Sequence, residues 1–132
     1  RGWGSELTGE ISLVESGMDR FFNLKKKNNF IGAKILQKKI QSGVDIKIVY
    51  LEVDVDDVDP SGNEPVYCNN KVVGVVTSGG YGFRSKKSLA FAYIKSDLIE
   101  APNLEIEIQG KKRKAKILHK VVYDPENKKL IA

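Results

Sequence analysis

Apolar and polar positions follow two different periods along this chain. Between residues 31 and 42 the apolar side chains are spaced so that they share one face of a helix, and lysines occupy the other face. The apolar positions are Ile31, Ile35, Leu36 and Ile40. Because Gly43 supplies a natural helix end, the sequence predicts one helix over residues 32–42.

Beyond Gly43 the apolar residues recur at every second position, as in strands with one buried face. Turn-forming residues separate short apolar stretches, and short connections favour antiparallel neighbours. We predict six strands, at residues 46–55, 65–69, 71–78, 88–95, 104–109 and 114–121. The predicted fold is therefore mainly β: a six-stranded antiparallel barrel or jelly roll packed against one helix and preceded by an irregular N-terminal segment.

Two details of these strands carry further expectations. The run from Val72 to Val76 is apolar on both sides, which indicates a strand buried on both faces. His119 is the single histidine and shares the phase of Ala115 and Ile117, which permits an interior position. A structural role is favoured for His119, because a nucleophile–base pair also needs a neighbour that the sequence does not identify.

Residues 1–30 follow neither period for long, and four glycines interrupt them. We expect an ordered but irregular segment that belongs with a neighbouring domain. The chain starts at Arg1 and not at Met, without the features of a signal or transit peptide, which favours a fragment of a longer parent protein. The apolar residues of this segment are expected to form an exposed patch and to promote association, and they are Met18, Phe21, Phe22, Leu24 and Phe30.

Charge and composition narrow the function classes. The formal net charge is +5, with basic clusters at residues 25–27 and 111–114. Few aromatic residues interleave with these clusters and both fall where turns are expected, so solvated loops are favoured over a nucleic-acid surface. Nucleic acid is therefore not expected as a partner. A membrane is not expected either, because no apolar run approaches the roughly 20 residues of a membrane-spanning helix. The lone Cys68 fits a reducing compartment and excludes a cysteine-rich zinc site.

Two stretches look like ligand sites but have the wrong spacing. The acidic run at residues 54–59 places Val58 at a position where a calcium loop needs an oxygen ligand. The glycines at residues 79, 80 and 82 lack the Gly-Lys-Ser/Thr ending of a phosphate-binding loop. The sequence therefore assigns no metal site and no catalytic residue to this chain.

Several segments in order resemble the aminomethyltransferase family of the glycine cleavage T-protein, and within it the folate-binding part of dimethylglycine and sarcosine dehydrogenases. The combination of a Val-Gly-x-Val-Thr-Ser-Gly strand with a Lys-Ser-Leu-Ala-Phe-Ala-Tyr strand is the more specific signal, and Trp-Gly-Ser-Glu-Leu points toward the dehydrogenases. The matching segments are residues 3–7, 30–36, 62–66, 73–79 and 87–93.

The resemblance implies two parts: residues 1–44 as the tail end of the folate-binding domain, with the helix, and residues 45–132 as the C-terminal β-barrel domain. It implies that the barrel helps to close a tetrahydrofolate site for one-carbon transfer from an amine donor. Upstream domains of the parent would carry the main folate-binding and catalytic residues, so the parent would be the enzyme and this chain alone inactive. FAD is implied only if a dehydrogenase domain lies upstream.

Three residues are implied as cofactor contacts. Arg20 occupies a position where relatives place an aromatic residue against the folate, and a guanidinium can stack on a flat ring. Lys128 and Lys129 match a segment where relatives place Tyr or Arg near the cofactor.

The implied compartment is the cytoplasm, or the mitochondrial matrix in a eukaryote. The alternative to an enzyme fragment is a binding module, a small basic β-barrel that binds a partner without catalysis. A basic face with stacking aromatic residues would favour the binding module. An apolar flank at residues 1–30 would favour the enzyme fragment.

Overall fold

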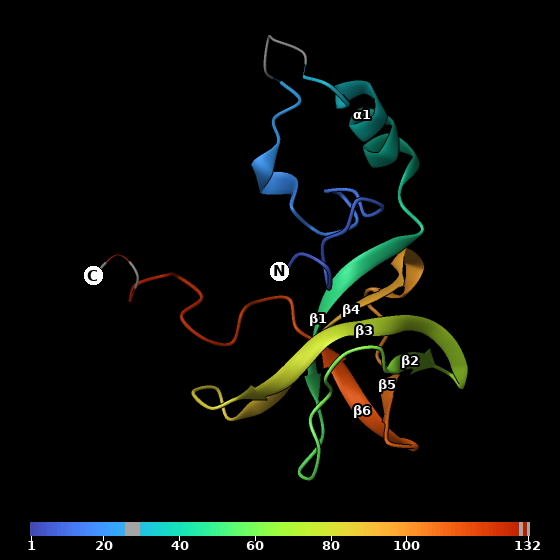
Figure 1. Cartoon of the computed structure of the whole chain (residues 1–132), viewed down its shortest axis with the longest axis vertical. Coiled ribbons are helices and arrows are strands. Elements are labelled where there is room, and N and C mark those ends of the chain that lie inside the picture. Colours follow the sequence, from blue (N-terminus) through green and yellow to red (C-terminus); the bar gives the residue numbers. More distant parts are fainter. Residues whose placement is uncertain (26–29, 130, 132) are drawn as a thin grey trace.

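The computed structural model describes residues 1–25, 30–129 and 131, and its centre is a closed antiparallel barrel (Figure 1). The order around the barrel is β1-β4-β3-β2-β5-β6. The strands are β1 (Ile46–Val53), β2 (Pro65–Cys68), β3 (Lys71–Gly82), β4 (Lys87–Lys95), β5 (Leu104–Ile108) and β6 (Lys111–Ile117). The predicted mainly β, six-stranded antiparallel barrel is confirmed.

The barrel interior is filled by the inward side of each strand. In β5 the side chains of Leu104, Ile106 and Ile108 are buried while the glutamates between them are partly exposed. This is the alternation that the sequence predicts for a strand with one wet face. Side chains from all six strands form the resulting core, including Leu51, Val66, Val76, Ile94, Ile106 and Ala115.

The predicted start of the last strand was wrong. We expected the basic cluster at residues 111–114 in a turn, but it lies in β6. Gln109 and Gly110 both have positive φ, at 50° and 75°, and this suits a two-residue hairpin turn that lets the strand begin directly at Lys111. Lys112 and Lys114 then stand opposite Glu107 and Glu105 on β5, so their charges are partly balanced within the sheet.

The expectation that Val72–Val76 is buried on both faces was also wrong. Val73 and Val76 are buried, but Val72 and Val75 are 59% and 41% exposed. A closed barrel has one interior, so an apolar strand is buried on both sides only where a second layer covers its outer face.

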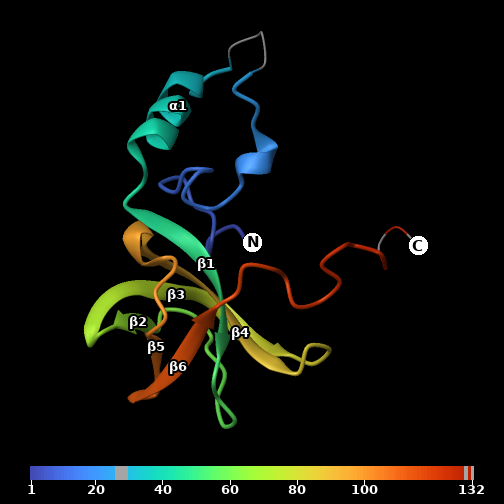
Figure 2. The same cartoon turned by 180° about the vertical axis from the view of Figure 1, so that it is seen from behind.

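The helix forms where the sequence predicts it but not where we expected it to pack. α1 (Ala33–Ser42) is flanked by Gly32 and Gly43, both with positive φ. It stands off from the barrel, beside the N-terminal segment (Figures 1 and 2). Only Leu36 of α1 is buried, and Ile35 is 69% exposed. The 3-10 helices η1 (Asp19–Phe21) and η2 (Ser96–Leu98) complete the described elements, among which no helix has the length and hydropathy to cross a membrane.

Candidate functional site

A cavity of about 340 Å³ lies where β1 and β4 meet the segment that follows β6. Tyr50 and Phe91 are directly opposite in the β1–β4 register, on the outer side of the barrel wall. Their ring centroids are 5.1 Å apart with an interplanar angle of 33°. Such an aromatic pair presents a broad apolar surface on which a flat ring can stack.

Three basic side chains and one carboxylate, that of Glu100, line the cavity together with this aromatic wall. The Arg1 guanidinium carbon lies 5.4 Å from the centroid of the Phe91 ring, and Lys47 and Lys120 also line the cavity. Burial, and next the neighbouring carboxylate of Glu52, raise the pKa of the Tyr50 phenol, so Tyr50 stays neutral near pH 7. The site therefore combines a neutral aromatic surface with positive charge.

The single histidine lies at the edge of the same cavity and not in the barrel interior. His119 Nε2 is 3.6 Å from a carboxylate oxygen of Glu100, and both side chains are mostly exposed. The strand alternation that permitted an interior position ends at Ile117, the last residue of β6. Among the described residues of the lining, no nucleophile is hydrogen-bonded to a base.

The N-terminal segment is fastened to the barrel beside the cavity by Glu6, whose side chain is buried. Its carboxylate accepts hydrogen bonds from the Gly2 N–H at 2.6 Å and from the Ser78 hydroxyl of β3 at 2.6 Å. The Tyr93 hydroxyl of β4 donates to the Glu6 carbonyl at 2.7 Å. Burial raises the pKa of the Glu6 carboxyl, but the hydrogen bonds, led by that from Ser78, outweigh it and lower the pKa overall.

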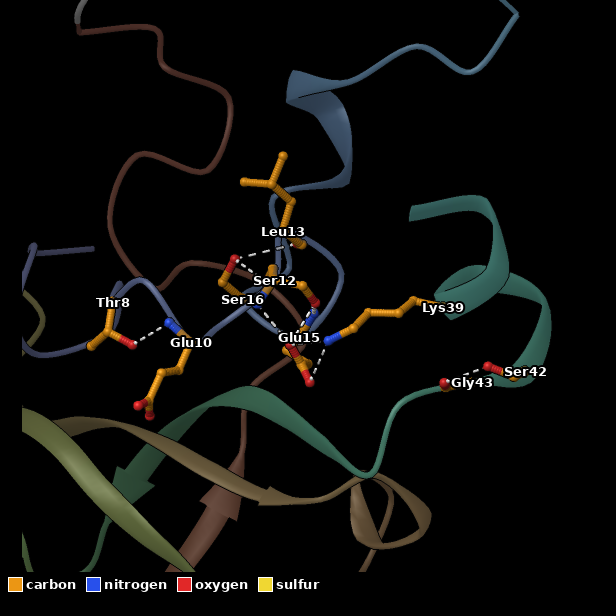
Figure 3. A network of polar contacts seen from close by, with 9 residues as sticks. All are labelled: Thr8, Glu10, Ser12, Leu13, Glu15, Ser16, Lys39, Ser42 and Gly43. Atoms are coloured by element: carbon orange, nitrogen blue, oxygen red, sulfur yellow. Dashed lines mark hydrogen bonds and ion pairs between the residues drawn. The ribbon is translucent and has the colours of Figure 1, made fainter. Parts of the chain in front are cut away.

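A second carboxylate links the same segment to the helix (Figure 3). Glu15 accepts hydrogen bonds from the backbone N–H and hydroxyl of Ser12, and from Lys39 of α1 at 3.1–3.2 Å. Its carbonyl accepts from the Ile48 N–H of β1 at 2.9 Å. Burial raises the pKa of the Glu15 carboxyl, and the contacts with Ser12 and Lys39 outweigh it, so the net shift is downward. Glu15 thus joins α1 to the barrel through the N-terminal segment.

The three residues implied as cofactor contacts lie outside this lining. Arg20 is exposed on η1, with its guanidinium carbon 4.8 Å from the ring centroid of Phe21. The backbone N–H groups of Lys128 and Lys129 donate to the Asp124 carboxylate at 2.9 and 3.0 Å, which fixes a turn in the tail.

The aromatic wall was missed by sequence reasoning. Tyr50 and Phe91 each occupy an outward position of a strand, and an isolated outward aromatic residue is unremarkable. Only the register of β1 against β4 makes them neighbours, and that register is a long-range property.

Two other hollows have a different chemistry. One of about 770 Å³ is bordered by Lys86, Lys114 and Lys116 together with the carboxylates of Glu52 and Asp54. One of about 440 Å³ lies beside Asn69, Asn70 and Glu105. The cavity of about 340 Å³ holds a tilted aromatic pair, three basic side chains and the carboxylate of Glu100. Within the described part of the chain, neither of the other two hollows offers an aromatic pair, so we consider the cavity beside Tyr50 and Phe91 the better candidate.

Comparisons with known proteins agree with this architecture. Residues 47–124 match the family model described as the glycine cleavage T-protein C-terminal barrel domain. The chain is 39% identical to the mitochondrial dimethylglycine dehydrogenase of Mus musculus over 98% of its length and 15% of that protein. It is 32% identical to an aminomethyltransferase of Prochlorococcus marinus (strain NATL1A), over 92% of this chain and 32% of that protein.

A solved structure shows the same fold. The crystal structure of glycine cleavage system aminomethyltransferase T from Bartonella henselae aligns with a TM-score of 0.78 at 22% identity, over 92% of this chain and 34% of that one. The chain therefore spans only 15–34% of the length of these relatives. With the barrel matched by both sequence and structure, the chain belongs to the glycine cleavage T-protein C-terminal barrel domain family.

Proposed function

We propose that this chain is the C-terminal barrel part of a larger folate-dependent enzyme and that its aromatic–cationic cavity forms one wall of the tetrahydrofolate site. The observation that carries the proposal is the pairing of Tyr50 with Phe91, with Arg1 over the Phe91 ring, in a cavity that Lys47 and Lys120 also line. Membership of the barrel family supports the choice of ligand.

The chemistry of the cavity fits tetrahydrofolate. The pair of Tyr50 and Phe91 offers a stacking surface for a flat ring, and Arg1, Lys47 and Lys120 offer positive charge for carboxylates. Tetrahydrofolate, when bound, supplies the nitrogen acceptor for a one-carbon unit. The residues of this chain would bind and orient the cofactor, and the chemistry would lie with other parts of the protein.

The parent protein would transfer a one-carbon unit from an amine donor, as the names of its relatives suggest. We assign residues 1–44 to the tail end of the folate-binding domain and residues 45–132 to the barrel domain. Upstream domains would supply the catalytic residues and complete the cofactor site, and FAD would be bound only by an upstream dehydrogenase domain. In a eukaryote we propose the mitochondrial matrix as the compartment, and otherwise the cytoplasm.

Arg20, Lys128 and Lys129 remain proposed contacts that act once the parent is complete. The guanidinium of Arg20 already lies over an aromatic ring, that of Phe21, so this side chain is available for contacts with flat rings. Lys129 lies 5.2 Å from the centroid of the Tyr123 ring. The lysines would meet the glutamate part of folate as point charges.

The alternative of a small basic binding module is less well supported. Its basic strand β6 faces Glu105 and Glu107, which reduces the positive potential there. The apolar flank expected for the enzyme fragment is present: Phe21, Leu24 and Phe30 are 61%, 39% and 38% exposed. A surface of this kind is typical of a region that another domain covers.

Binding of 5-formyltetrahydrofolate, a stable folate, tests the proposal. We expect calorimetry on the 132-residue chain to show no micromolar affinity, because upstream domains supply most contacts. Equilibrium dialysis at millimolar ligand should show weak binding that falls with added salt and in Lys47→Ala and Lys120→Ala, but not in Lys95→Ala, a control lysine outside the cavity lining. Equal effects of all three substitutions, or no binding at all, would contradict the proposal.

A further inference from the structure

Residues 2–7 form a compact turn that is closed around the Glu6 carboxylate. The backbone N–H groups of Glu6 and Leu7 both donate to the Gly2 carbonyl, at 3.2 and 3.1 Å, and the Gly4 N–H donates to Leu7 at 2.8 Å. The Gly2 N–H and the Ser5 hydroxyl donate to the carboxylate from within the same turn. We call residues 2–7 the N-terminal turn.

Glu6 is the only carboxylate among the described side chains that is buried, with 2% exposure. It faces no cation within ion-pair distance among the described residues; its charge is balanced by hydrogen-bond donors alone. One of these donors, Ser78, comes from β3, at the point where its pairing with β4 is irregular. A buried carboxylate is strongly destabilising unless its oxygens are hydrogen-bonded, so this geometry fixes the N-terminal turn against the barrel.

Arg1 directly precedes the N-terminal turn and lies in the candidate site. Its guanidinium is held over Phe91, and it also passes close to Gly17, where an added Cβ would be 3.5 Å from Arg1 Nη2. Arginine has a long, mobile side chain, so ordering it above one ring has an entropic cost. The N-terminal turn reduces that cost by fixing the backbone at Gly2, the next residue.

We propose that Glu6 is a positioning residue that holds the Arg1 guanidinium over Phe91 through the N-terminal turn and Ser78. The positioned guanidinium makes the rim of the cavity selective for an anionic aromatic ligand. The positioning is independent of any ligand, and its consequence for binding rests on the function proposed above. The Trp-Gly-Ser-Glu stretch thus has a mechanical role, in which Gly4 adopts φ of 92° to close the turn and Glu6 fastens it.

A ligand-free NMR measurement tests the positioning itself. Protons of the Arg1 side chain above the Phe91 ring should have ring-current shifts, which Phe91→Leu removes. Glu6→Gln should weaken them too, because an amide has one accepting oxygen, whereas the carboxylate uses one oxygen for the Gly2 N–H and the other for the Ser78 hydroxyl. Ser78→Ala should weaken them, and Ser78→Thr, which keeps the hydroxyl, should retain them.

Glu15→Gln is the matched control, since Glu15 is a hydrogen-bonded carboxylate of the same segment that faces Lys39 of α1. It should leave the Arg1 shifts unchanged. Unchanged shifts in folded Glu6→Gln and Ser78→Ala, or an equal loss in Glu15→Gln, would overturn the positioning role. If Glu6→Gln does not fold, the comparison of Ser78→Ala with Ser78→Thr decides.

The ligand arm uses 5-formyltetrahydrofolate and a double-mutant cycle. Arg1→Ala and Glu6→Gln should each weaken binding by about threefold to tenfold, and the double variant should be no weaker than Arg1→Ala alone, because Glu6 acts through Arg1. Additive losses would refute that coupling. Absence of binding in the wild type would refute the proposed function, while the ring-current result would still decide the positioning role.

Discussion

At the scale of single residues, two glycines of the Val-Gly-x-Val-Thr-Ser-Gly strand are explained by close backbone contacts. A Cβ at Gly74 would lie 2.1 Å from the Tyr93 carbonyl oxygen, and one at Gly79 would lie 2.5 Å from the Pro60 carbonyl oxygen. Both neighbours are backbone atoms of packed segments, which move only with difficulty. The sequence signals these glycines as a motif, but only the structure shows what approaches them.

Gly74→Ala should therefore destabilise the barrel. The added methyl group must displace β4, and overpacking of this kind costs about 1–3 kcal/mol. Urea unfolding measures the change in free energy. Gly9→Ala is the control, since a Cβ at Gly9 meets nothing within 4 Å, and a loss as large as that of Gly74→Ala would show that the close approach at β4 is not the cause.

Glu6 makes the stability of the chain depend on pH. Its folded-state pKa is lowered, so its contribution to stability is fully present above the unfolded-state pKa of about 4.3 and is lost as the pH falls through the lower folded-state pKa. Unfolding free energies of the wild type and Glu6→Gln should thus differ most near neutral pH and converge in acid. A difference that grows as the pH falls would contradict this direction.

At the scale of elements, strand existence was predictable and strand limits were not. Alternation in residues 104–108 indicated β5 correctly because each inward position is apolar and each outward position is charged. The limits of β6 were missed because lysine charge was given more weight than the two-residue turn at Gln109–Gly110. The exposure of Val72 and Val75 was missed because a run of valines has the same pattern whether or not a second layer covers it.

The core contribution of β5 can be measured directly. Ile106→Ala should cost about 2–5 kcal/mol of unfolding free energy, because the side chain is fully buried in the barrel and its removal leaves a cavity. Val72→Ala, on the exposed side of β3, should change it by less than about 0.5 kcal/mol. Thermal or urea unfolding of the two variants compares them, and similar losses would argue against a single barrel interior.

At the scale of the whole molecule, the chain has a well-packed barrel and a poorly covered N-terminal part. None of Met18, Phe21, Phe22, Leu24 and Phe30 is fully buried. This exposure agrees with the expectation of an apolar patch, and the length of the relatives agrees with a domain of a larger protein. The irregular pattern of residues 1–30 predicted poor coverage of this segment, but the site on the barrel wall depends on contacts between residues 1, 50 and 91 that no local pattern reveals.

Exposure of this patch should promote self-association of the isolated chain through residues 1–30. Phe21→Ser should shift the sedimentation-velocity distribution toward monomer at high concentration, because burial of an aromatic side chain is a main source of association free energy. Phe83→Ser is the control, since Phe83 is 85% exposed on the β3–β4 hairpin. A wild type that stays monomeric at all concentrations would contradict this prediction.

A residue-resolved map of folate contact on the 132-residue chain tests most directly whether the aromatic–cationic cavity faces folate. In a titration of ¹⁵N-labelled protein with 5-formyltetrahydrofolate, we expect amide shift changes concentrated at Tyr50, Phe91 and Leu118, which line this cavity. Shift changes concentrated instead at Lys86, Lys114 and Lys116, around the larger mixed-charge hollow, would contradict the assignment of the folate-facing wall.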